Sequence, residues 1–177
     1  MQVAILAGGL ATRLGILARN QPKSMLEVHG KAFLEYQLEL LQRSGIEKVV
    51  LCIGHMASQI ERHISSGKKY GMEIKCSFED KPLGTAGALR KAEPLLDDPF
   101  FTIYGDSYIF LDFNLIMQYF RSQDKLALMT VYKNNNRYDR SNTVVKRNLI
   151  KRYSKDEKSE DMVYIEYGGE YLQERSN

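Results

Sequence analysis

Apolar and polar positions follow two different periods in the first two thirds of the chain. Short, mainly apolar runs are typical of strands buried in a parallel sheet, and they lie at residues 2–6, 48–54, 72–78 and 100–106. Amphipathic segments with helical spacing lie between and after them, at residues 32–45, 57–67, 84–96 and 113–123. In the first of these, Phe33, Leu34, Leu38 and Leu41 are predicted to share one face, and Gly45 is a typical helix-ending residue. This order of elements predicts a three-layer α/β/α fold, Rossmann-like, with a mainly parallel mixed sheet.

The pattern changes after residue 123. Strand-like pieces separated by polar turns lie at residues 126–133, 143–145, 149–153 and 162–168. They predict a small antiparallel C-terminal extension whose strands end at Gly168. No internal repeat or low-complexity linker marks a boundary, and a length of 177 residues suits one domain with its own core. We therefore expect a single domain over residues 1–177.

The composition is ordinary for a soluble globular protein, with 44% hydrophobic and 27% charged residues. No apolar run approaches the roughly 20 residues that a membrane span needs, so we expect no membrane association. Met1 leads almost directly into the first strand without a basic leader, which predicts a cytoplasmic protein with no signal peptide. Cys52 and Cys76 lie in strand-like runs and are spaced for neither a zinc site nor a CxxC pair, so we expect buried free thiols.

The net charge of +3 is unevenly distributed. Between Lys133 and Lys158 there are nine Lys or Arg residues and three Asp or Glu residues. This segment is either a solvated hairpin surface or a basic rim that attracts a phosphorylated small molecule. No RNA-binding or helix-turn-helix signature accompanies the charge, so we expect no nucleic-acid partner.

The loop after the first strand suggests a phosphate site. The stretch from Leu6 to Met25 reads LAGGLATRLGILARNQPKSM. Adjacent glycines allow backbone N–H groups to approach an anion closely, and Arg13 and Lys23 suit phosphate oxygens. The spacing fits neither a Walker A loop nor a Rossmann turn, and two adjacent glycines are more often a tight turn than a site.

Two further stretches carry candidate chemistry. Asp106 directly follows a buried strand, where a carboxylate either binds a cation such as Mg²⁺ or caps a neighbouring helix. In EDKPLGTAGAL, Gly84 and Thr85 begin a predicted helix whose N-terminus either serves a ligand or is simply capped and tightly packed. Ligands of open α/β sheets bind beyond the carboxyl ends of the strands, where both the glycine loop and Asp106 are predicted to lie.

Together these stretches resemble the sugar-1-phosphate nucleotidyltransferase family. Its signature, L-A-G-G-x-G-T-R-L with a downstream Pro-Lys, is followed by G-T-A-G-A-L and by a strand ending in G-D-S. The resemblance runs from Met1 to about Gly168 and is greatest to the bacterial branch that includes heptose-1-phosphate guanylyltransferases. It implies a nucleotide-diphospho-sugar transferase-like fold and transfer of a nucleotidyl group from an NTP to a sugar 1-phosphate, with release of pyrophosphate. Such products are precursors of surface polysaccharide or cell wall.

The resemblance also assigns roles by position. Residues 1–123 would form the nucleotide-binding half and residues 124–177 part of a sugar-binding half. Catalysis would involve Arg13, Lys23 and Asp106, with Asp106 binding Mg²⁺ as the cofactor. The nucleotide would be bound by Leu6, Ala7, Gly8, Gly9, Thr12, Arg13, Glu79, Gly84 and Thr85. The sugar phosphate would be bound by Asn142, Lys155 and Glu166.

The sequence departs from the family pattern in two places. Ala11 replaces the usual glycine of the loop, and family members continue past Gly168 with a second metal-binding aspartate and often an oligomer contact. One alternative is therefore a shortened, inactive module that binds a nucleotide or sugar phosphate. We also expect association with a second copy or another chain through an apolar edge or face left open after Gly168. A glycosyltransferase is a further alternative, but Asp106-Ser107-Tyr108 lacks the D-x-D pair usual in that class.

Overall fold

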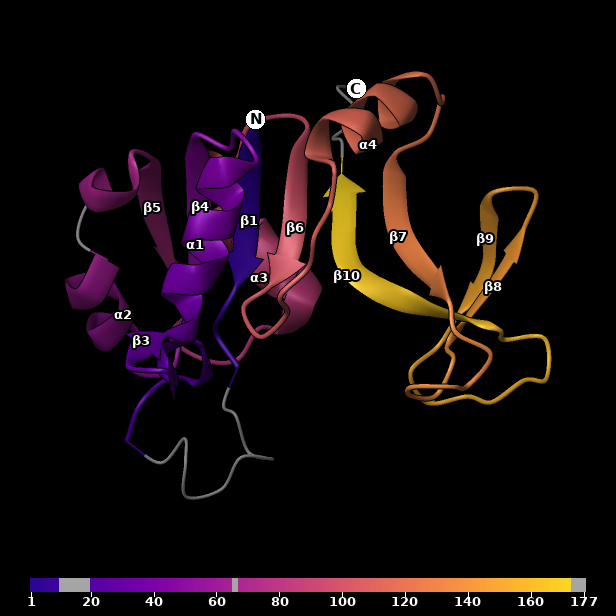
Figure 1. The fold of residues 1–177 in the computed structure, drawn as a ribbon, viewed down its shortest axis with the longest axis horizontal. Helices are drawn as coiled ribbons and strands as arrows, with labels where there is room; N and C mark the ends of the chain where they lie inside the picture. Colours follow the sequence, from indigo (N-terminus) through magenta and orange to yellow (C-terminus); the bar gives the residue numbers. More distant parts are fainter. Residues whose placement is uncertain (10–19, 65–66, 173–177) are drawn as a thin grey trace.

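The computed structural model describes residues 1–9, 20–64 and 67–172. Its strands are β1 (Gln2–Leu6), β2 (Glu27–Val28), β3 (Lys31–Ala32), β4 (Lys48–Ile53), β5 (Glu73–Phe78), β6 (Phe100–Tyr104), β7 (Ala127–Lys133), β8 (Thr143–Lys146), β9 (Leu149–Tyr153) and β10 (Tyr164–Leu172). Eight of them form one sheet in the order β5-β4-β1-β6-β10-β8-β9, with β7 also paired to β10 (Figure 1). β2 and β3 form a separate two-stranded ribbon.

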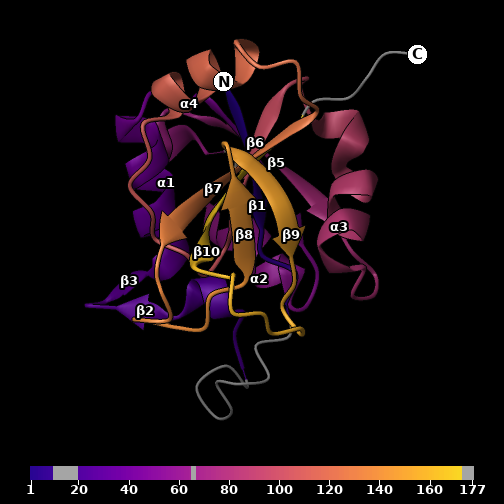
Figure 2. The ribbon, with the colours of Figure 1, turned by 90° about the vertical axis from the view of Figure 1, so that its right-hand side faces the viewer.

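The helices cover both faces of the parallel part of the sheet. They are α1 (Phe33–Arg43), α2 (Ala57–Ile64), α3 (Gly84–Ala92) and α4 (Phe113–Arg121), with 3-10 turns η2 (Lys23–Met25), η3 (Lys68–Tyr70) and η4 (Glu93–Leu95). Buried side chains of α1, α2 and α4 pack in one core cluster, whereas Ala88 and Ala92 of α3 pack against Val50 and Cys52 in another. Figure 2 shows α1 and α4 on one side of the sheet and α3 on the other. The predicted three-layer fold is confirmed.

The sheet is parallel in one half and antiparallel in the other. β5, β4, β1 and β6 run parallel, so their carboxyl ends meet at one edge. β10 lies antiparallel to β6 and also pairs antiparallel with β7 and β8, while β8 and β9 form a hairpin. This half is the predicted antiparallel extension.

The prediction that the strands end at Gly168 is wrong. β10 continues to Leu172, and Gly169–Leu172 pairs with β6. Gly168 has a φ of +64°, and the register with β7 shifts between Glu166 and Glu170, so the glycine forms an irregularity within the strand. Because β10 covers the edge of β6, that edge gives no reason for the chain to self-associate. Self-association remains a prediction.

The two cysteines are free, and they differ in exposure. Cys52 is buried and Cys76 is half-buried. Burial raises the pKa of the Cys52 thiol to about 12 and that of Cys76 to about 11. Both side chains therefore remain protonated thiols at neutral pH. In residues 1–9, 20–64 and 67–172, no helix has the length and apolar character that crossing a membrane requires.

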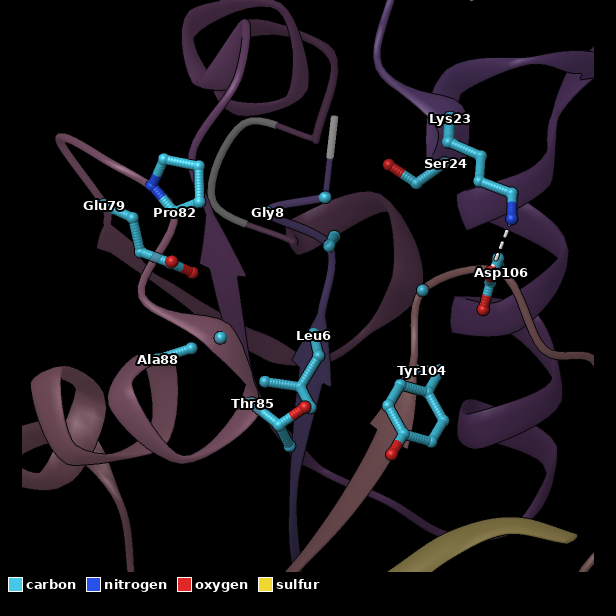
Figure 3. Close-up of a pocket in the computed structure, with 14 residues that line it drawn as sticks. Leu6, Gly8, Lys23, Ser24, Glu79, Pro82, Thr85, Ala88, Tyr104 and Asp106 are labelled. Carbon is cyan, nitrogen blue, oxygen red and sulfur yellow. Dashed lines mark hydrogen bonds and ion pairs between the residues drawn. The ribbon is translucent and has the colours of Figure 1, made fainter. Parts of the chain in front are cut away.

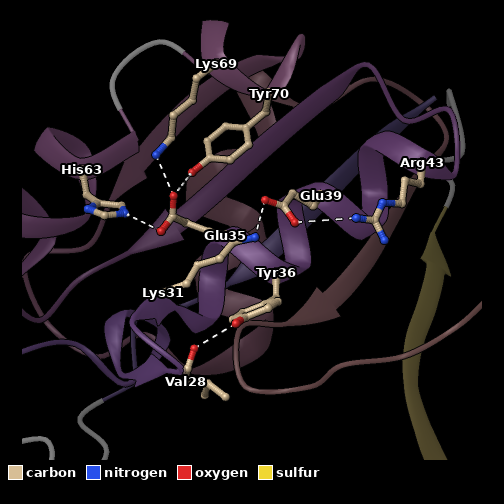
Figure 4. A network of polar contacts seen from close by, with 9 residues as sticks. All are labelled: Val28, Lys31, Glu35, Tyr36, Glu39, Arg43, His63, Lys69 and Tyr70. Atoms are coloured by element: carbon tan, nitrogen blue, oxygen red, sulfur yellow. Dashed lines mark hydrogen bonds and ion pairs between the residues drawn. The ribbon is translucent and has the colours of Figure 1, made fainter.

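Polar contacts on the outer side of α1 join it to α2 and η3 (Figure 4). Glu35 accepts hydrogen bonds from Lys69 at 2.7 Å and from Tyr70 at 2.9 Å, and His63 lies 3.2 Å from its other oxygen. Its side chain is 16% exposed. Burial would raise the pKa of Glu35, but the hydrogen bonds from Lys69, Tyr70 and His63 outweigh it and lower the pKa to about 2.

This lowered pKa predicts a loss of stability in acid. The interaction is fully present above the ordinary pKa of 4.5 and is lost as the pH falls from 4.5 towards 2. Because one pKa unit corresponds to about 1.4 kcal/mol, the loss in unfolding free energy is at most about 3.5 kcal/mol. We expect Glu35→Gln to remove this pH-dependent part, as measured by urea unfolding between pH 6 and pH 2.5. Glu39→Gln, on the same helix, is the control and should retain it; an unchanged pH dependence in Glu35→Gln would contradict the assignment.

Candidate functional site

A cavity of about 420 Å³ lies at the carboxyl edge of the parallel strands (Figure 3). β1 and β6 are neighbours, so the segments that follow them, beginning at Ala7 and Gly105, lie side by side. Their first peptide groups continue the sheet, because Ala7 donates to the carbonyl of Cys52 at 2.8 Å and Gly105 donates to that of Leu6 at 2.9 Å. The cavity is lined by Leu6, Ala7, Gly8, Gly9, Lys23, Ser24, Glu79, Pro82, Gly84, Thr85, Ala88, Tyr104, Gly105 and Asp106.

One wall of the cavity brings the glycine loop against the segment before α3. A Cβ atom at Gly8 would lie 2.6 Å from Oε1 of Glu79, so a side chain here would displace the Glu79 carboxylate from its present place. The backbone N–H of Glu79 donates to Ile53 at 2.7 Å, and Oε2 of Glu79 accepts from the backbone N–H of Leu83 at 3.2 Å. Glu79 is therefore held from both sides, with its carboxylate at the cavity beside the first turn of α3.

The opposite wall carries a cation and an anion in direct contact. Nζ of Lys23 lies 2.5 Å from Oδ2 of Asp106, as the dashed line in Figure 3 marks. Lys23 begins the η2 turn after Pro22, and Asp106 follows β6. The two side chains are 42% and 44% exposed, so both remain accessible to a ligand. Without a ligand, each neutralises the other.

A second polar cluster lies beside the cavity, in the antiparallel half. Oε2 of Glu166 accepts a hydrogen bond from Tyr153 at 2.5 Å and lies 3.7 Å from Nζ of Lys155. Asn142 is bound to the same strand, because its Oδ1 accepts from the backbone N–H of Glu166 at 3.1 Å. Nζ of Lys155 also lies 5.3 Å from the ring centre of Tyr104, which lines the cavity. The cluster is thus connected to the cavity wall.

One oxygen of the Glu166 carboxylate has no donor among the residues that the structure describes. The Glu166 side chain is 6% exposed, and its Oε1 is buried without a hydrogen-bond partner in residues 1–9, 20–64 and 67–172. A buried carboxylate oxygen without a donor is costly, and a hydroxyl group of a ligand would satisfy it.

The structure brings most of the predicted site residues into two groups. Seven of the predicted nucleotide-binding residues line the cavity, and so do Lys23 and Asp106. The three predicted sugar-side residues form the cluster around Glu166. Thr12 and Arg13 lie outside the described residues. The cavity lining also includes Ser24, Pro82, Tyr104 and Gly105, which were not among the predicted site residues, although each is in or next to a stretch that the sequence singles out.

The basic segment 133–158 divides between the two interpretations left open. Lys155 lies in the cluster around Glu166, as a basic rim near the cavity requires. Arg140 and Arg152 instead contact Glu157, at the exposed surface of the hairpin.

The residues at the cavity fit a magnesium ion held jointly with a substrate. Within residues 1–9, 20–64 and 67–172, no group of three or more His, Cys, Asp or Glu side chains could hold a metal ion by itself. Mg²⁺ typically binds one or two protein carboxylates together with waters and substrate phosphates. The accessible carboxylate of Asp106, at the end of the cavity that carries Lys23, suits this mode.

Comparison with known proteins identifies relatives over most of the chain. A model of the family described as "Nucleotidyl transferase" matches residues 2–157. A D-glycero-alpha-D-manno-heptose 1-phosphate guanylyltransferase of Campylobacter jejuni is 32% identical over 144 residues, which are 81% of this chain and 62% of that protein. A UTP–glucose-1-phosphate uridylyltransferase of Synechocystis sp. is 32% identical over 139 residues, which are 72% of this chain and 36% of that protein. The chain thus spans between about a third and three fifths of the length of these curated relatives.

Solved structures show the same fold. HddC from Yersinia pseudotuberculosis, complexed with GMP-PN, superposes with a TM-score of 0.76 at 28% identity, covering 97% of this chain and 76% of that chain. A putative glucose-1-phosphate thymidylyltransferase from Bacillus anthracis, in complex with a sucrose, has a TM-score of 0.81 at 22% identity, covering 98% and 71%. The second similarity shows the fold alone.

Proposed function

The chain belongs to the nucleotidyl transferase family, and from this membership we propose that it transfers a nucleotidyl group from an NTP to a sugar 1-phosphate. The products are an NDP-sugar, used for surface polysaccharide or cell-wall synthesis, and pyrophosphate. The observation that carries the proposal is the single cavity that joins the glycine loop, the Lys23–Asp106 pair and Glu79, with the Glu166 cluster beside it. Together these groups offer a phosphate end, a base end and a sugar side.

The chemistry needs little more than positioning and neutralisation of charge. A sugar 1-phosphate is already ionised at neutral pH, so its oxygen attacks the α-phosphorus of the NTP without a strong general base. The backbone of Ala7–Gly9 holds the phosphates, and Lys23 bridges phosphate oxygens of both reactants as negative charge shifts to the leaving pyrophosphate. Arg13 and Thr12 are proposed to assist from the same loop.

Magnesium is proposed as the cofactor, with Asp106 as its protein ligand. Asp106 would hold the ion, and the ion would supply positive charge that stabilises the negative charge developing on the phosphates. The phosphates of the nucleotide would also attract Lys23 away from Asp106, and so free the carboxylate for the ion. The ion pair of the unliganded protein thus favours binding of metal and nucleotide together.

The carboxylate of Glu79 favours guanine as the base. An ionised carboxylate only accepts hydrogen bonds, and each oxygen accepts more than one, so both remain available despite the bond from Leu83. Guanine presents adjacent N1–H and N2–H donors on one edge, whereas the N3–H of uracil is flanked by carbonyl oxygens that the carboxylate repels. The names of the Campylobacter guanylyltransferase and of the Yersinia complex with GMP-PN support the same choice.

Replacing Glu79 with glutamine is expected to reduce the preference for GTP over UTP by about 10- to 100-fold. The amide replaces one acceptor with a donor, and a hydrogen bond to a charged group contributes about 1.5 to 3 kcal/mol. Relative kcat/KM values for the two nucleotides measure the change. Asp80→Asn is the matched control, because it removes the neighbouring carboxylate, which is exposed and paired with Lys91 at 2.9 Å. Equal preference ratios in Glu79→Gln and wild type would exclude Glu79 from base selection.

The cluster around Glu166 is proposed as the sugar side. The buried Oε1 of Glu166, which has no donor among the described residues, accepts a hydrogen bond from a sugar hydroxyl. Asn142 fixes the backbone of the same residue, and Lys155 attracts the 1-phosphate.

A panel of four NTPs against several sugar 1-phosphates, with Mg²⁺ and pyrophosphate detection, tests the proposal. Pyrophosphate release that needs a sugar 1-phosphate supports a transferase. Nucleotide binding without pyrophosphate release in any combination would overturn it in favour of a binding module.

A further inference from the structure

A buried glutamine of α1 donates hydrogen bonds to the turn that contains Asp106. Gln37 is 2% exposed, and its Nε2 donates to the backbone carbonyl of Tyr104 at 2.9 Å and to that of Ser107 at 2.6 Å. These two carbonyls flank Gly105 and Asp106 on either side. One side-chain amide therefore spans both ends of the four-residue turn and ties it to a helix 67 to 70 positions earlier in the sequence.

The direction of the amide is set by its partners. Carbonyl oxygens only accept, so the nitrogen of Gln37 must face them, and its oxygen points the other way. That oxygen, Oε1, is buried without a hydrogen-bond partner among the described residues. The acceptor half of the amide is therefore an energetic cost, and the donor half is what the turn uses.

The position of Gln37 in α1 makes a purely packing role inadequate. The other buried residues of the helix are Leu34, Leu38 and Leu41, and all lie on the apolar face that contacts the sheet. An apolar side chain at position 37 would continue this face without the unpaired oxygen. It would, however, leave the carbonyl of Ser107 without its donor from α1.

We propose that Gln37 is a positioning residue, which fixes the Tyr104–Ser107 turn so that the Asp106 carboxylate and the Tyr104 ring keep their places at the cavity. The inference rests on the proposed function, in which Asp106 binds the metal that accompanies the nucleotide. Gln37 itself does not line the cavity. It acts through the backbone on either side of Asp106.

Gln37→Met tests the inference, because methionine keeps the length of the side chain and removes both donors. The first readout is hydrogen exchange of the backbone amide of Ser107, which donates to the carbonyl of Tyr104 at 3.1 Å. We expect this exchange to become at least tenfold faster. The second readout is the gain in GTP affinity that Mn²⁺ produces, which we expect to fall at least tenfold, while GTP affinity without metal changes less than twofold.

Gln2→Met is the matched control. Gln2 is also buried, and its amide also binds the backbone of a distant segment, at Leu95 and Asp97. Gln2 is the first residue of β1, and it lies at the end of the parallel strands opposite the cavity. A general loss of packing would appear in both variants, whereas a changed Mn²⁺ effect should appear only in Gln37→Met.

A third test uses the wild-type protein, so its result does not depend on whether a variant folds. The side-chain amide hydrogens of Gln37 should exchange far more slowly than those of Gln118, which is exposed on α4. If the two side-chain amides exchanged equally fast, the proposed hydrogen bonds from Gln37 to the Tyr104–Ser107 turn would be contradicted.

The outcomes separate this inference from the proposed function. Asp106→Asn should abolish the Mn²⁺ effect on GTP binding. If it does so and Gln37→Met leaves both the Mn²⁺ effect and Ser107 exchange unchanged, the role of Gln37 is wrong and the metal role of Asp106 stands. If Asp106→Asn leaves the Mn²⁺ effect intact, the proposed metal role fails, and with it the role of Gln37 in that chemistry.

Discussion

Replacing Lys23 with alanine is expected to lower kcat by about 100- to 1,000-fold with little loss of folding stability. Lys23 lines the cavity beside Asp106. In the proposed reaction it lies at the phosphate end, where negative charge would move to the leaving pyrophosphate in the transition state. Removing one such stabilising contact costs about 3 to 4 kcal/mol of barrier height. The ion pair with Asp106 is more than 40% exposed on both sides, and exposed pairs contribute only about 0 to 1 kcal/mol to folding.

Steady-state kinetics and thermal unfolding measure the two effects separately. Lys48→Ala is a close control, because the Lys48–Asp97 pair is 3.0 Å long, is similarly exposed and lies at the opposite end of the strands. We expect near wild-type kinetics from Lys48→Ala. A Lys23→Ala protein that turns over at the wild-type rate would remove the basis for the phosphate site.

Replacing Asp106 with asparagine is expected to lower turnover more than 100-fold and to remove most of its response to Mg²⁺. Asparagine has nearly the same shape but no charge, so it cannot hold the ion as the carboxylate does. Stabilisation of phosphate charge by a metal ion is worth several kcal/mol, which corresponds to this fall in rate.

Asp106→Asn should also change GTP binding in the absence of metal, in a direction that a folding defect would not produce. Asp106 neutralises Lys23 at 2.5 Å in the unliganded protein, so its replacement leaves Lys23 free to attract phosphates. We therefore expect GTP to bind Asp106→Asn without metal at least as tightly as it binds wild type. Asp97→Asn, at the remote pair, is the control. A magnesium titration of activity that is identical in Asp106→Asn and wild type would show that Asp106 has no metal role.

The alternation of elements could be predicted because each segment has one dominant period. The strand 48–54 is apolar throughout, and the helix 32–45 repeats its leucines every three or four residues, so the local pattern alone defines both. The family could be predicted from the order of three motifs, and the family model that matches residues 2–157 confirms it.

The path of β10 could not be predicted because it depends on long-range pairing. Gly168 is an ordinary strand-ending residue in the sequence, whereas in the structure its positive φ permits a register shift and the strand goes on to pair with β6. The pairing of β10 with β6 joins residues more than sixty positions apart in the sequence, so no local pattern could indicate it.

Among the residues of the cavity wall, too, some features follow from the local sequence and others depend on long-range pairing. Gly8 and Asp106 could be placed at strand ends, but their nearness depends on β1 and β6 being neighbours, which no local pattern states. Tyr104 could not be recognised as a site residue because it belongs to an apolar strand, and Gln37 could not because it belongs to an amphipathic helix. The signal for Gln37 was present, because it is a polar residue one position before Leu38 on a face that is otherwise leucine, but a buried amide has meaning only when its partners are known.

The most direct test of the central claim is to follow pyrophosphate and nucleotide sugar together in one reaction. The purified chain is mixed with Mg²⁺, GTP and a sugar 1-phosphate that the substrate panel selects, and both products are quantified over time. The account predicts equal amounts of the two products, no pyrophosphate when the sugar 1-phosphate is omitted, and a rate that falls at least 100-fold in Lys23→Ala. Pyrophosphate release that is independent of the sugar phosphate, or tight GTP binding with neither product under any pairing, would contradict it.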